Sequence, residues 1–292
     1  MILVFGSINI DLVVPVPILP HAGETVLGGD YALLPGGKGA NQALAARRAG
    51  AEVVLAGAVG PDGFADAALE NLRRNGVVLD PVRQVQGPTG CAAIMVGGDG
   101  ENLIAVAPGA NREASAAALP DALLGPETTV LCQNEAPIAE SAALIRRARA
   151  RSARTMLNLA PAGPIPADLL PELDFLILNE TEAAMLDADS AASARGLRQA
   201  LILTLGVRGA TAFLADGGRV DVPALAIAPV DTTGAGDTFV GVLAAGLDGG
   251  LALEPALRRA SAAASLACLA QGAQTAMPGR AEIDAALARL PA

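Results

Sequence analysis

Asp-Thr-Thr-Gly-Ala-Gly-Asp, residues 231 to 237, is a polar, glycine-rich turn that follows the apolar run 222–230. A helix is predicted over residues 238–247, directly after this turn. Gly234 and Gly236 allow the backbone to turn sharply and to approach a ligand closely. The predicted helix directs its unpaired N–H groups and its positive dipole end at the turn. A turn of this kind binds anions, most often phosphate.

Asp237 is the unexpected member of this turn, because a carboxylate repels a bound anion. An Asp in the first turn of a helix is favoured electrostatically, which would explain Asp237 taken alone. It does not explain two glycines, two threonines and a second acid, Asp231. A site that needs both an anion cradle and a base would explain all of them, and phosphoryl transfer to a hydroxyl is such chemistry.

Length and composition limit the classes of protein to which this chain can belong. The 292 residues suffice for one large α/β domain or two small ones. Apolar residues make up 52% of the chain and aromatic residues only 2%, so we expect an aliphatic core with closely packed helices. The net charge of −10 argues against a nucleic-acid partner. A small phosphate ligand needs only local positive potential and stays possible.

The cysteines, the histidine and the first residues bear on location. Cys91, Cys132 and Cys268 are widely spaced in apolar runs, which predicts buried free thiols in a reducing compartment. His21 is the single histidine, which argues against a zinc site or a His-dependent triad. The start of the chain lacks a basic region and carries Asp11, so it is interpreted as a strand. No stretch reaches about 18 apolar residues, and we expect a soluble, cytoplasmic protein without membrane contact.

Short apolar runs alternate with helical patterns along the chain, which predicts an α/β fold with a parallel sheet. The predicted strands are 2–5, 53–59, 129–132, 155–159, 175–178 and 201–204. The predicted helices are 64–75, 137–150, 238–247, 254–270 and 280–290. Two hairpins are predicted, one from 91–96 and 102–107, the other from 210–214 and 219–222.

Polar residues follow several of these strands. They are Gln133, Asn134, Glu135, Asn158, Asn179 and Thr204. Ligands of open parallel sheets bind outside the carboxyl ends of the strands, so these residues predict a pocket. Asn9 and Asp11, after the first strand, share one face by the two-residue period of a strand. They indicate a ligand face, or alternatively a half-exposed strand with its polar side in water.

A second glycine-rich turn, Gly36-Gly37-Lys38-Gly39-Ala40-Asn41, leads into an alanine-rich helix that ends at Gly50. It offers backbone donors and one cation, but lacks the spacing of a Walker P-loop. A flexible loop is the alternative. The preceding segment 15–34 contains strand-like pieces at 25–27 and 31–34. It could join the hairpin 91–107 in a small separate sheet.

These two glycine motifs, in this order, make the chain resemble the PfkB carbohydrate kinases. The resemblance covers nearly the whole chain. It includes Gly-Ser-Ile-Asn-Ile-Asp at 6–11, Pro-Gly-Ala-Asn at 108–111, Asn-Glu-Thr-Glu at 179–182 and Thr-Leu-Gly at 204–206. It implies one domain over 1–292, with a doubly wound, mostly parallel sheet flanked by helices. A small β-sheet lid formed by about 12–34 and 90–107 is implied as well, together with a homodimer through that lid.

The resemblance also implies a role for individual residues. Sugar hydroxyls are expected to contact Asn9, Asp11, Gly37, Lys38, Asn41 and Glu135. The nucleotide is expected along Asn179, Thr204 and Gly206, with Mg²⁺ held through water by Asn179 and Glu182. The anion hole is expected to consist of Gly234, Ala235 and Gly236, with Asp237 as the catalytic base.

A monovalent cation, K⁺, is a further implication of the resemblance. Its oxygen ligands, mainly backbone carbonyls, are expected from Asp231, Thr233, Ala267, Ala270 and Gly272. The chain departs from the family pattern at Ala276, which stands where a serine often helps, and in the shorter segment 186–199. With alanine at position 276, both activation by a cation and its absence are compatible with the sequence.

The expected activity is transfer of the γ-phosphoryl group of ATP to a small sugar, with D-ribose, giving ribose 5-phosphate, as the favoured acceptor. Alternatives are 2-deoxyribose, a ketohexose, or a nucleoside such as adenosine or pseudouridine; the few aromatic residues favour a sugar over a base. A non-catalytic sensor would have lost Asp237 or the Gly-Ala-Gly turn, and both are intact. A dehydrogenase fingerprint is disfavoured because Phe239 occupies the position of its next glycine.

Overall fold

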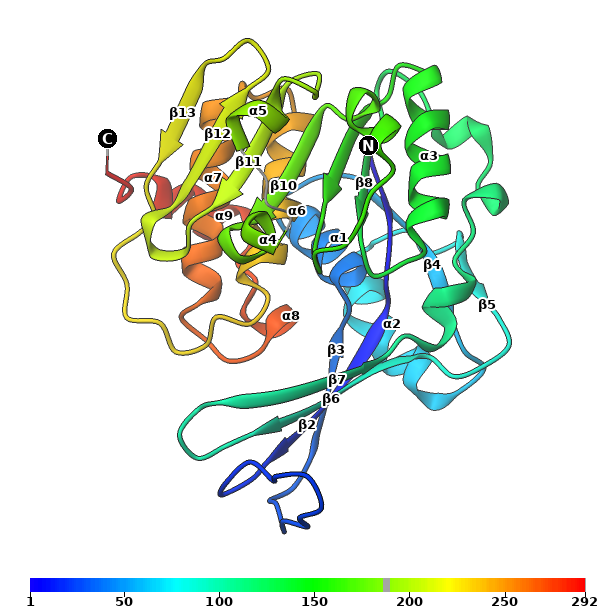
Figure 1. Cartoon of the computed structure of the whole chain (residues 1–292), viewed down its shortest axis with the longest axis vertical. Coiled ribbons are helices and arrows are strands. Elements are labelled where there is room, and N and C mark those ends of the chain that lie inside the picture. Colours follow the sequence, from blue (N-terminus) through cyan, green and yellow to red (C-terminus); the bar gives the residue numbers. More distant parts are fainter. Residues whose placement is uncertain (186–189, 292) are drawn as a thin grey trace.

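Runs of apolar residues form the central strands of the larger sheet, as expected for strands covered by helices on both faces, whereas the edge strands are polar and largely exposed. In the computed structural model, which describes residues 1–185 and 190–291, nine strands form this sheet (Figure 1). Their spatial order is β13 (Arg219–Val222), β12 (Ala210–Leu214), β11 (Ala200–Thr204), β10 (Phe175–Asn179), β9 (Arg154–Asn158), β8 (Thr129–Gln133), β1 (Ile2–Phe5), β4 (Val53–Val59) and β5 (Val82–Gln84). β12 runs antiparallel to both neighbours, and the remaining pairs are parallel. The predicted mostly parallel α/β sheet is confirmed.

Helices cover both faces of this sheet, and the side chains of β1 alternate between them. Ile2 and Val4 pack on one side and Leu3 and Phe5 on the other, and all four are buried. The first side holds α1 (Lys38–Arg48), α2 (Gly63–Arg74), α6 (Ala235–Asp248), α7 (Leu253–Ala267), α8 (Ala273–Ala276) and α9 (Arg280–Leu287). The second side holds α3 (Ile138–Ala150), α4 (Glu180–Met185) and α5 (Ser190–Ala194). Short 3₁₀ helices lie in the connections: η1 (Gly109–Glu113), η2 (Ala116–Ala118), η3 (Asp121–Leu123), η4 (Ala167–Glu172) and η5 (Gly206–Arg208).

Helices α1 and α6 pack closely because small residues lie where they cross. A Cβ added at Gly241 of α6 would lie 2.5 Å from the carbonyl oxygen of Gln42 and 2.7 Å from the Cβ of Ala45. The expectation of closely packed helices is therefore confirmed at this crossing.

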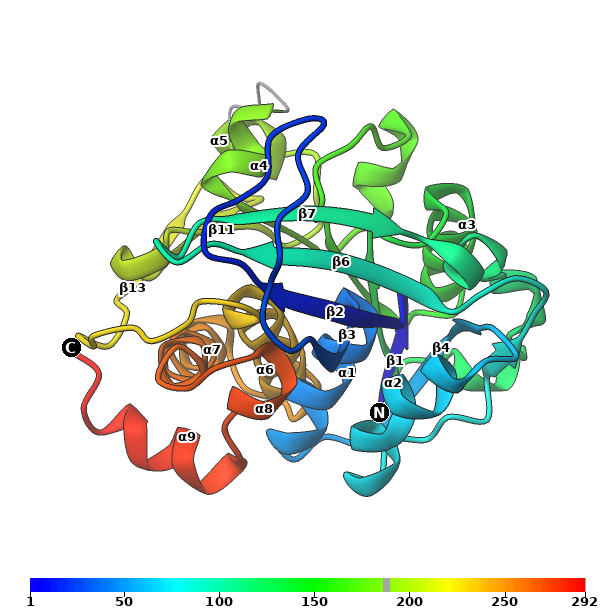
Figure 2. The same ribbon diagram turned by 90° about the horizontal axis from the view of Figure 1, so that it is seen from below.

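The second sheet consists of four strands in the order β3 (Ala32–Gly36), β2 (Asn9–Pro15), β6 (Gly90–Val96) and β7 (Asn102–Ala107). It projects from the α/β body (Figure 1) and crosses the end of that body, with α7, α8 and α9 on one side of it and α3, α4 and α5 on the other (Figure 2). The predicted hairpin of β6 and β7 is confirmed as an antiparallel pair.

Two predictions for this region need correction. No strand forms at 25–27; this segment lies in an exposed connection, and Leu27 is 88% exposed, so it has no packing that would hold it in a sheet. Asn9 and Asp11 do not extend β1, because the chain turns at Gly6 to Ile8 and starts the second sheet at Asn9. Their common face therefore belongs to β2.

Three helix boundaries differ from prediction by three residues, and one of them is the end of α9, which lies at Leu287 instead of residue 290. α6 begins at Ala235, because Gly234 adopts a left-handed conformation (φ 74°) and caps the helix. Asp237 consequently lies in the first turn. α7 ends at Ala267, because Cys268 leaves the helix and its carbonyl oxygen accepts the Val230 N–H at 2.8 Å.

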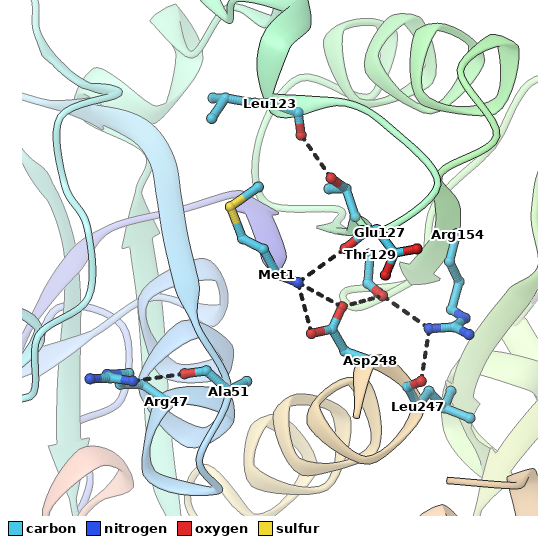
Figure 3. A network of polar contacts seen from close by, with 10 residues as sticks. Met1, Arg47, Ala51, Leu123, Glu127, Thr129, Arg154, Leu247 and Asp248 are labelled. Carbon is cyan, nitrogen blue, oxygen red and sulfur yellow. Dashed lines mark hydrogen bonds and ion pairs between the residues drawn. The ribbon is translucent and has the colours of Figure 1, made fainter. Parts of the chain in front are cut away.

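The carboxyl end of α6 is fixed by polar contacts at the opposite edge of the sheet (Figure 3). Arg154 donates to the carbonyl oxygen of Leu247 at 2.9 Å and to the Thr129 hydroxyl at 3.2 Å. Thr129 in turn donates to Asp248 at 3.0 Å, and the Met1 amino group lies 3.0 Å from the same carboxylate. These contacts anchor the helix at the end remote from the 231–237 turn.

Three further expectations can be compared with the structure. All three cysteines are free, but only Cys132 is buried; the predicted burial is wrong for Cys91, on the second sheet, and for Cys268, just after α7. In the segment 186–199, residues 186–189 lie outside the described part. Within residues 1–185 and 190–291, no helix is long and apolar enough to cross a bilayer.

Candidate active site

A cavity of about 230 Å³ opens where β9, β10 and β11 end, beside the start of α6. The last residues of these strands, Asn158, Asn179 and Thr204, contribute to its wall. The other predicted site residues in the wall are Lys38, Glu182, Gly234, Gly236 and Asp237. Residues from both glycine motifs, distant in sequence, therefore face one cavity.

The start of α6 leaves open space next to its first N–H groups. Gly234 cannot carry a side chain, because a Cβ there would lie 2.7 Å from the Cβ of Ala273. The carbonyl oxygen of Gly234 accepts both the N–H and the hydroxyl of Thr238, at 2.8 and 2.9 Å, which closes the first turn around Ala235. A Cβ added at Gly236 would meet no described atom within 4 Å. An anion can occupy that space, facing the positive end of the helix.

Asp237 is buried in this first turn, and its carboxylate is held by helix α1. Asn41 Nδ2 donates to Asp237 Oδ2 at 2.9 Å, and Gln42 Nε2 donates to Asp237 Oδ1 at 2.9 Å. Both carboxylate oxygens are therefore fixed by amides of the motif that begins at Gly36.

Lys38 supplies positive charge to the cavity. The negative charge of Asp237 raises the pKa of its ammonium; burial opposes this effect, and Glu135, Glu182 and Asp11 add to it. Lys38 therefore stays protonated at neutral pH and partly offsets four carboxylates where an anion would enter.

Glu135 lies beside the start of α1, outside the residues that line the cavity. Its Oε2 accepts the Ser7 hydroxyl at 2.6 Å and the backbone N–H of Lys38 at 3.1 Å. Ser7 is in the turn between the two sheets, so Glu135 connects that turn to the start of α1.

Asn9 and Asp11 approach from the second sheet. Asn9 Oδ1 accepts Asn111 Nδ2 at 2.7 Å, which fixes the amide orientation. Burial, with the nearby charges of Glu135 and Asp237, raises the pKa of Asp11 to about 6. Gly37 (φ 87°) is closely approached, since a Cβ there would lie 2.8 Å from the backbone nitrogen of Asn9.

On the opposite side, Asn179 and Glu182 hold each other at the start of α4. The N–H of Asn179 donates to Glu182 Oε2 at 2.8 Å, and the N–H of Glu182 donates to Asn179 Oδ1 at 2.7 Å. Burial raises the pKa of Glu182. Thr204 pairs with Asn179 across β10 and β11, whereas Gly206 lies beyond it in η5, outside the residues that line the cavity.

Of the residues expected around a monovalent cation, the structure brings Asp231, Thr233 and Gly272 together. Asp231 Oδ1 accepts the N–H and the hydroxyl of Thr233 at 2.9 and 2.6 Å, and Oδ2 accepts the N–H of Gly272 at 2.8 Å. Burial alone would raise the pKa of Asp231, but these hydrogen bonds lower it. Ala267 is the last residue of α7, and Ala270 lies in the turn that follows. Among the residues described, no cluster of three His, Cys, Asp or Glu side chains could hold a metal ion by itself.

Sequence reasoning missed several buried amides around Asp237. Gln42 lies between Asp237 and Asn158, and Gln274 Nε2 donates to Asn41 Oδ1 at 3.1 Å. Gln42 follows Asn41 in an alanine-rich helix, and an amide at a buried helical position must find partners. That requirement was a usable signal, although the identity of the partners was not.

The fold and cavity first define a class. A doubly wound sheet whose carboxyl edge carries an anion-binding helix start, a cation and a buried carboxylate is organised as in small-molecule phosphotransferases. The chain belongs to the pfkB family of carbohydrate kinases, whose profile matches residues 1–280.

Particular relatives are ribokinases. The chain is 40% identical to ribokinase of Bacillus subtilis (strain 168) over 287 residues, which is 97% of this chain and 98% of that protein. A crystal structure of ribokinase from Thermotoga maritima matches with a TM-score of 0.91 at 31% identity, covering 99% of each chain. A structure of Arabidopsis thaliana ribokinase complexed with ribose and ATP matches with a TM-score of 0.87 at 31% identity, covering 98% of each chain. The expected family and fold class are confirmed.

Proposed function

We propose that the protein is an ATP-dependent kinase that phosphorylates D-ribose to ribose 5-phosphate. The observation that carries this proposal is Asp237, a carboxylate in the same helix turn whose N–H groups face open space for an anion. A base for the acceptor hydroxyl and a cradle for the transferred group are then adjacent. The relatives named ribokinase favour ribose over other acceptors.

The sugar is proposed to bind between the start of α1 and β2. Its hydroxyls would contact Asn9, Asp11, Gly37, Lys38, Asn41 and Glu135, residues that are mostly polar and approach from two sides. The second sheet would act as a lid over the sugar within a single kinase domain spanning 1–292. Support comes from Asp11 of β2, whose pKa is raised by burial and by the charges of Glu135 and Asp237, so that it lies near both carboxylates.

The nucleotide is proposed to lie along Asn179, Thr204 and Gly206. Mg²⁺ fits the oxygen donors present, since Glu182 and Asn179 each accept one N–H and keep further lone pairs for water. When bound with ATP, Mg²⁺ neutralises phosphate charge.

Transfer then follows from the positions of the side chains. The acceptor hydroxyl attacks the γ-phosphorus, the bond to the β–γ bridging oxygen breaks, and ADP leaves. Asp237 is a far weaker base than an alkoxide, so it takes the hydroxyl proton late, as the new O–P bond forms. The N–H groups of Gly234 and Gly236, with Lys38, would stabilise the charge on the transferred group. The Ala235 N–H would join them by leaving the carbonyl oxygen of Thr232, to which it donates at 3.2 Å.

K⁺ is proposed as an activator bound beside the anion hole. Asp231 and the backbone carbonyls of Thr233, Ala267, Ala270 and Gly272 would be its ligands. The hydrogen bonds of Asp231 with Thr233 and Gly272 hold two loops together at this position, which supports the proposed cation site. Ala276 stands where a serine often occurs in the family, so no hydroxyl is available at this position. Activation by K⁺ would therefore depend on the remaining oxygens.

A homodimer through the second sheet is also proposed. β7 is exposed along its whole length and carries Leu103, Ile104 and Val106, which are 42%, 53% and 52% exposed. A second copy of the sheet would cover this apolar surface.

The free cysteines and the acidic composition support a cytoplasmic location.

The test is release of ADP with a panel of acceptors: ribose, 2-deoxyribose, fructose, adenosine and pseudouridine, each in potassium and in a bulky organic cation. We expect the highest kcat/KM with ribose and a faster rate in potassium. A higher kcat/KM with another acceptor would replace ribose by that substrate. No turnover with any acceptor would favour a non-catalytic sensor.

A further inference from the structure

Gln42 of α1 uses both N–H donors of its amide within the protein. It is fully buried. One N–H of Nε2 donates to Asp237 Oδ1 and the other to Asn158 Oδ1, both at 2.9 Å, while Oε1 accepts Gln133 Nε2 at 2.7 Å. Because a glutamine amide has only two N–H donors, Gln42 has none left for a sugar or a nucleotide.

Three partners set the orientation of this amide: Asp237 and Asn158 accept its N–H groups, and Gln133, the last residue of β8, donates to its oxygen. If the Gln42 amide were reversed, its oxygen would face the carboxylate of Asp237 and the amide oxygen of Asn158. Gln133 Oε1 has no hydrogen-bond partner among the described residues. A reversed Gln133 would put that oxygen against Gln42 Oε1 instead, so the direction of donation runs from Gln133 through Gln42 to Asp237.

Asn41 receives a second chain of donors. Asn71 Nδ2 donates to Gln274 Oε1 at 3.2 Å, Gln274 Nε2 donates to Asn41 Oδ1 at 3.1 Å, and Asn41 donates to Asp237 Oδ2. Asn41 differs from Gln42 in that its amide nitrogen donates to Asp237 alone among the described residues, which leaves its second N–H for a ligand. Asn41 can therefore contact both the acceptor and the base, whereas Gln42 contacts only protein.

We propose that Gln42 is a positioning residue that orients the carboxylate of Asp237, with Gln133 stabilising the direction in which Gln42 donates. The terminal torsion of an aspartate is broad, so the carboxylate needs external donors to hold one orientation. With one donor on each oxygen, the remaining lone pairs of Asp237 have a defined direction toward the acceptor hydroxyl. This inference rests on the proposed function, in which Asp237 is the base.

Gln42→Met tests the role, because it keeps a similar length and removes both donors. We expect kcat to fall about 10- to 100-fold, the range that misplacing a catalytic group by about 1 Å can cause. KM for ribose and for ATP should change less than about 2-fold, because Gln42 has no donor left for either substrate. Gln133→Met should lower kcat in the same way but less, because it removes only one of the three partners of the Gln42 amide.

Leu144→Ala, in the buried core of α3, is the control for lost stability, with no connection to Asp237. We expect its kcat to stay near that of the unmodified protein at temperatures well below its Tm. If Gln42→Met does not fold, Gln133→Met decides: an unchanged kcat there overturns the proposal.

The proposal and the base assignment can fail separately. A kcat of Gln42→Met within about 2-fold of the unmodified protein, with Asp237→Asn inactive, overturns the positioning role but leaves Asp237 as the base. A loss confined to KM also overturns it, since that would mean direct substrate contact. Near-normal turnover of Asp237→Asn would instead refute the proposed function of the site.

Discussion

At the scale of single residues, Asp237 and Gly236 explain why one helix turn can serve two substrates. The side chain of Asp237 is buried against amides of α1, while the space beside Gly236 is open. In the proposed reaction, adjacent positions of one turn would therefore direct a carboxylate at the acceptor and backbone N–H groups at the phosphate.

Asp237→Asn is expected to lower kcat by at least about 10²-fold, because the amide cannot accept the proton of the hydroxyl. Ribose affinity should stay near normal, since the isosteric side chain keeps the local packing. Steady-state ADP release and calorimetric titration with ribose measure the two quantities. Loss of ribose binding in this variant would mean that the substitution disturbs the pocket.

The raised pKa of Asp11 makes the stability of the folded protein depend on pH, and the direction of this dependence can be worked out. Its pKa rises from 3.8 to about 6 in the folded protein, so the folded state binds the proton more tightly than the unfolded state. This group therefore adds stability that is full below the unfolded pKa and is lost as pH rises through about 6.

We expect Asp11→Asn to match the unmodified, ligand-free protein in stability at pH about 4 and to exceed it at pH about 7, because asparagine never carries the buried charge. Urea unfolding at both pH values measures the difference. A difference independent of pH would show that Asp11 does not titrate in this range.

At the scale of elements, the crossing of α1 and α6 joins the two glycine motifs. Gly241 lies one helical turn after Asp237 and lets α1 approach until Gln42 reaches the carboxylate. The hydrogen bonds to Asp237 therefore depend on a missing side chain four residues away.

Gly241→Ala is expected to destabilise the protein by about 1–3 kcal/mol, the usual cost of overpacking, although alanine favours a helix. Gly63→Ala is the matched control, because Gly63 begins α2 and a Cβ there would meet no described atom within 4 Å. We expect that control to be neutral or stabilising. Chemical unfolding of both variants distinguishes a steric effect at the crossing from a general effect of glycine replacement.

At the scale of the whole molecule, the site lies where two sheets meet. The ends of strands of the larger sheet and the start of α6 line the cavity, and Asn9 and Asp11 of β2, in the second sheet, are proposed to bind the sugar beside it (Figures 1 and 2). The second sheet is also where apolar side chains remain exposed, on β7. Substrate binding and dimer formation are thus proposed for the same small element.

Ile104→Glu is expected to convert the proposed dimer into a monomer, because a charge in an apolar interface is costly to bury. Light scattering after size-exclusion chromatography measures the mass. Val78→Glu is the control, an exposed apolar side chain outside the second sheet. A mass unaffected by Ile104→Glu would refute an interface at this position.

The local patterns of the sequence predicted most elements and the place of the site. Runs such as 53–59 and 210–214 form strands with these bounds, because strands buried on both faces need continuous apolar residues. Polar residues at strand ends, with two glycine-rich helix starts, pointed to one pocket. These are local signals, carried by neighbouring residues along the chain.

Tertiary structure alone decided which distant groups meet. No local pattern could show that Gln42 and Asn41 would hold Asp237, or that Gln133 would orient Gln42 from another strand. The same holds for Asn9 and Asp11, which the sequence assigned to the end of the first strand and the fold placed in the second sheet. The physical reason is that side-chain hydrogen bonds depend on how closely helices and sheets pack. That distance is set by contacts such as Gly241 against Gln42, which join residues far apart in the chain.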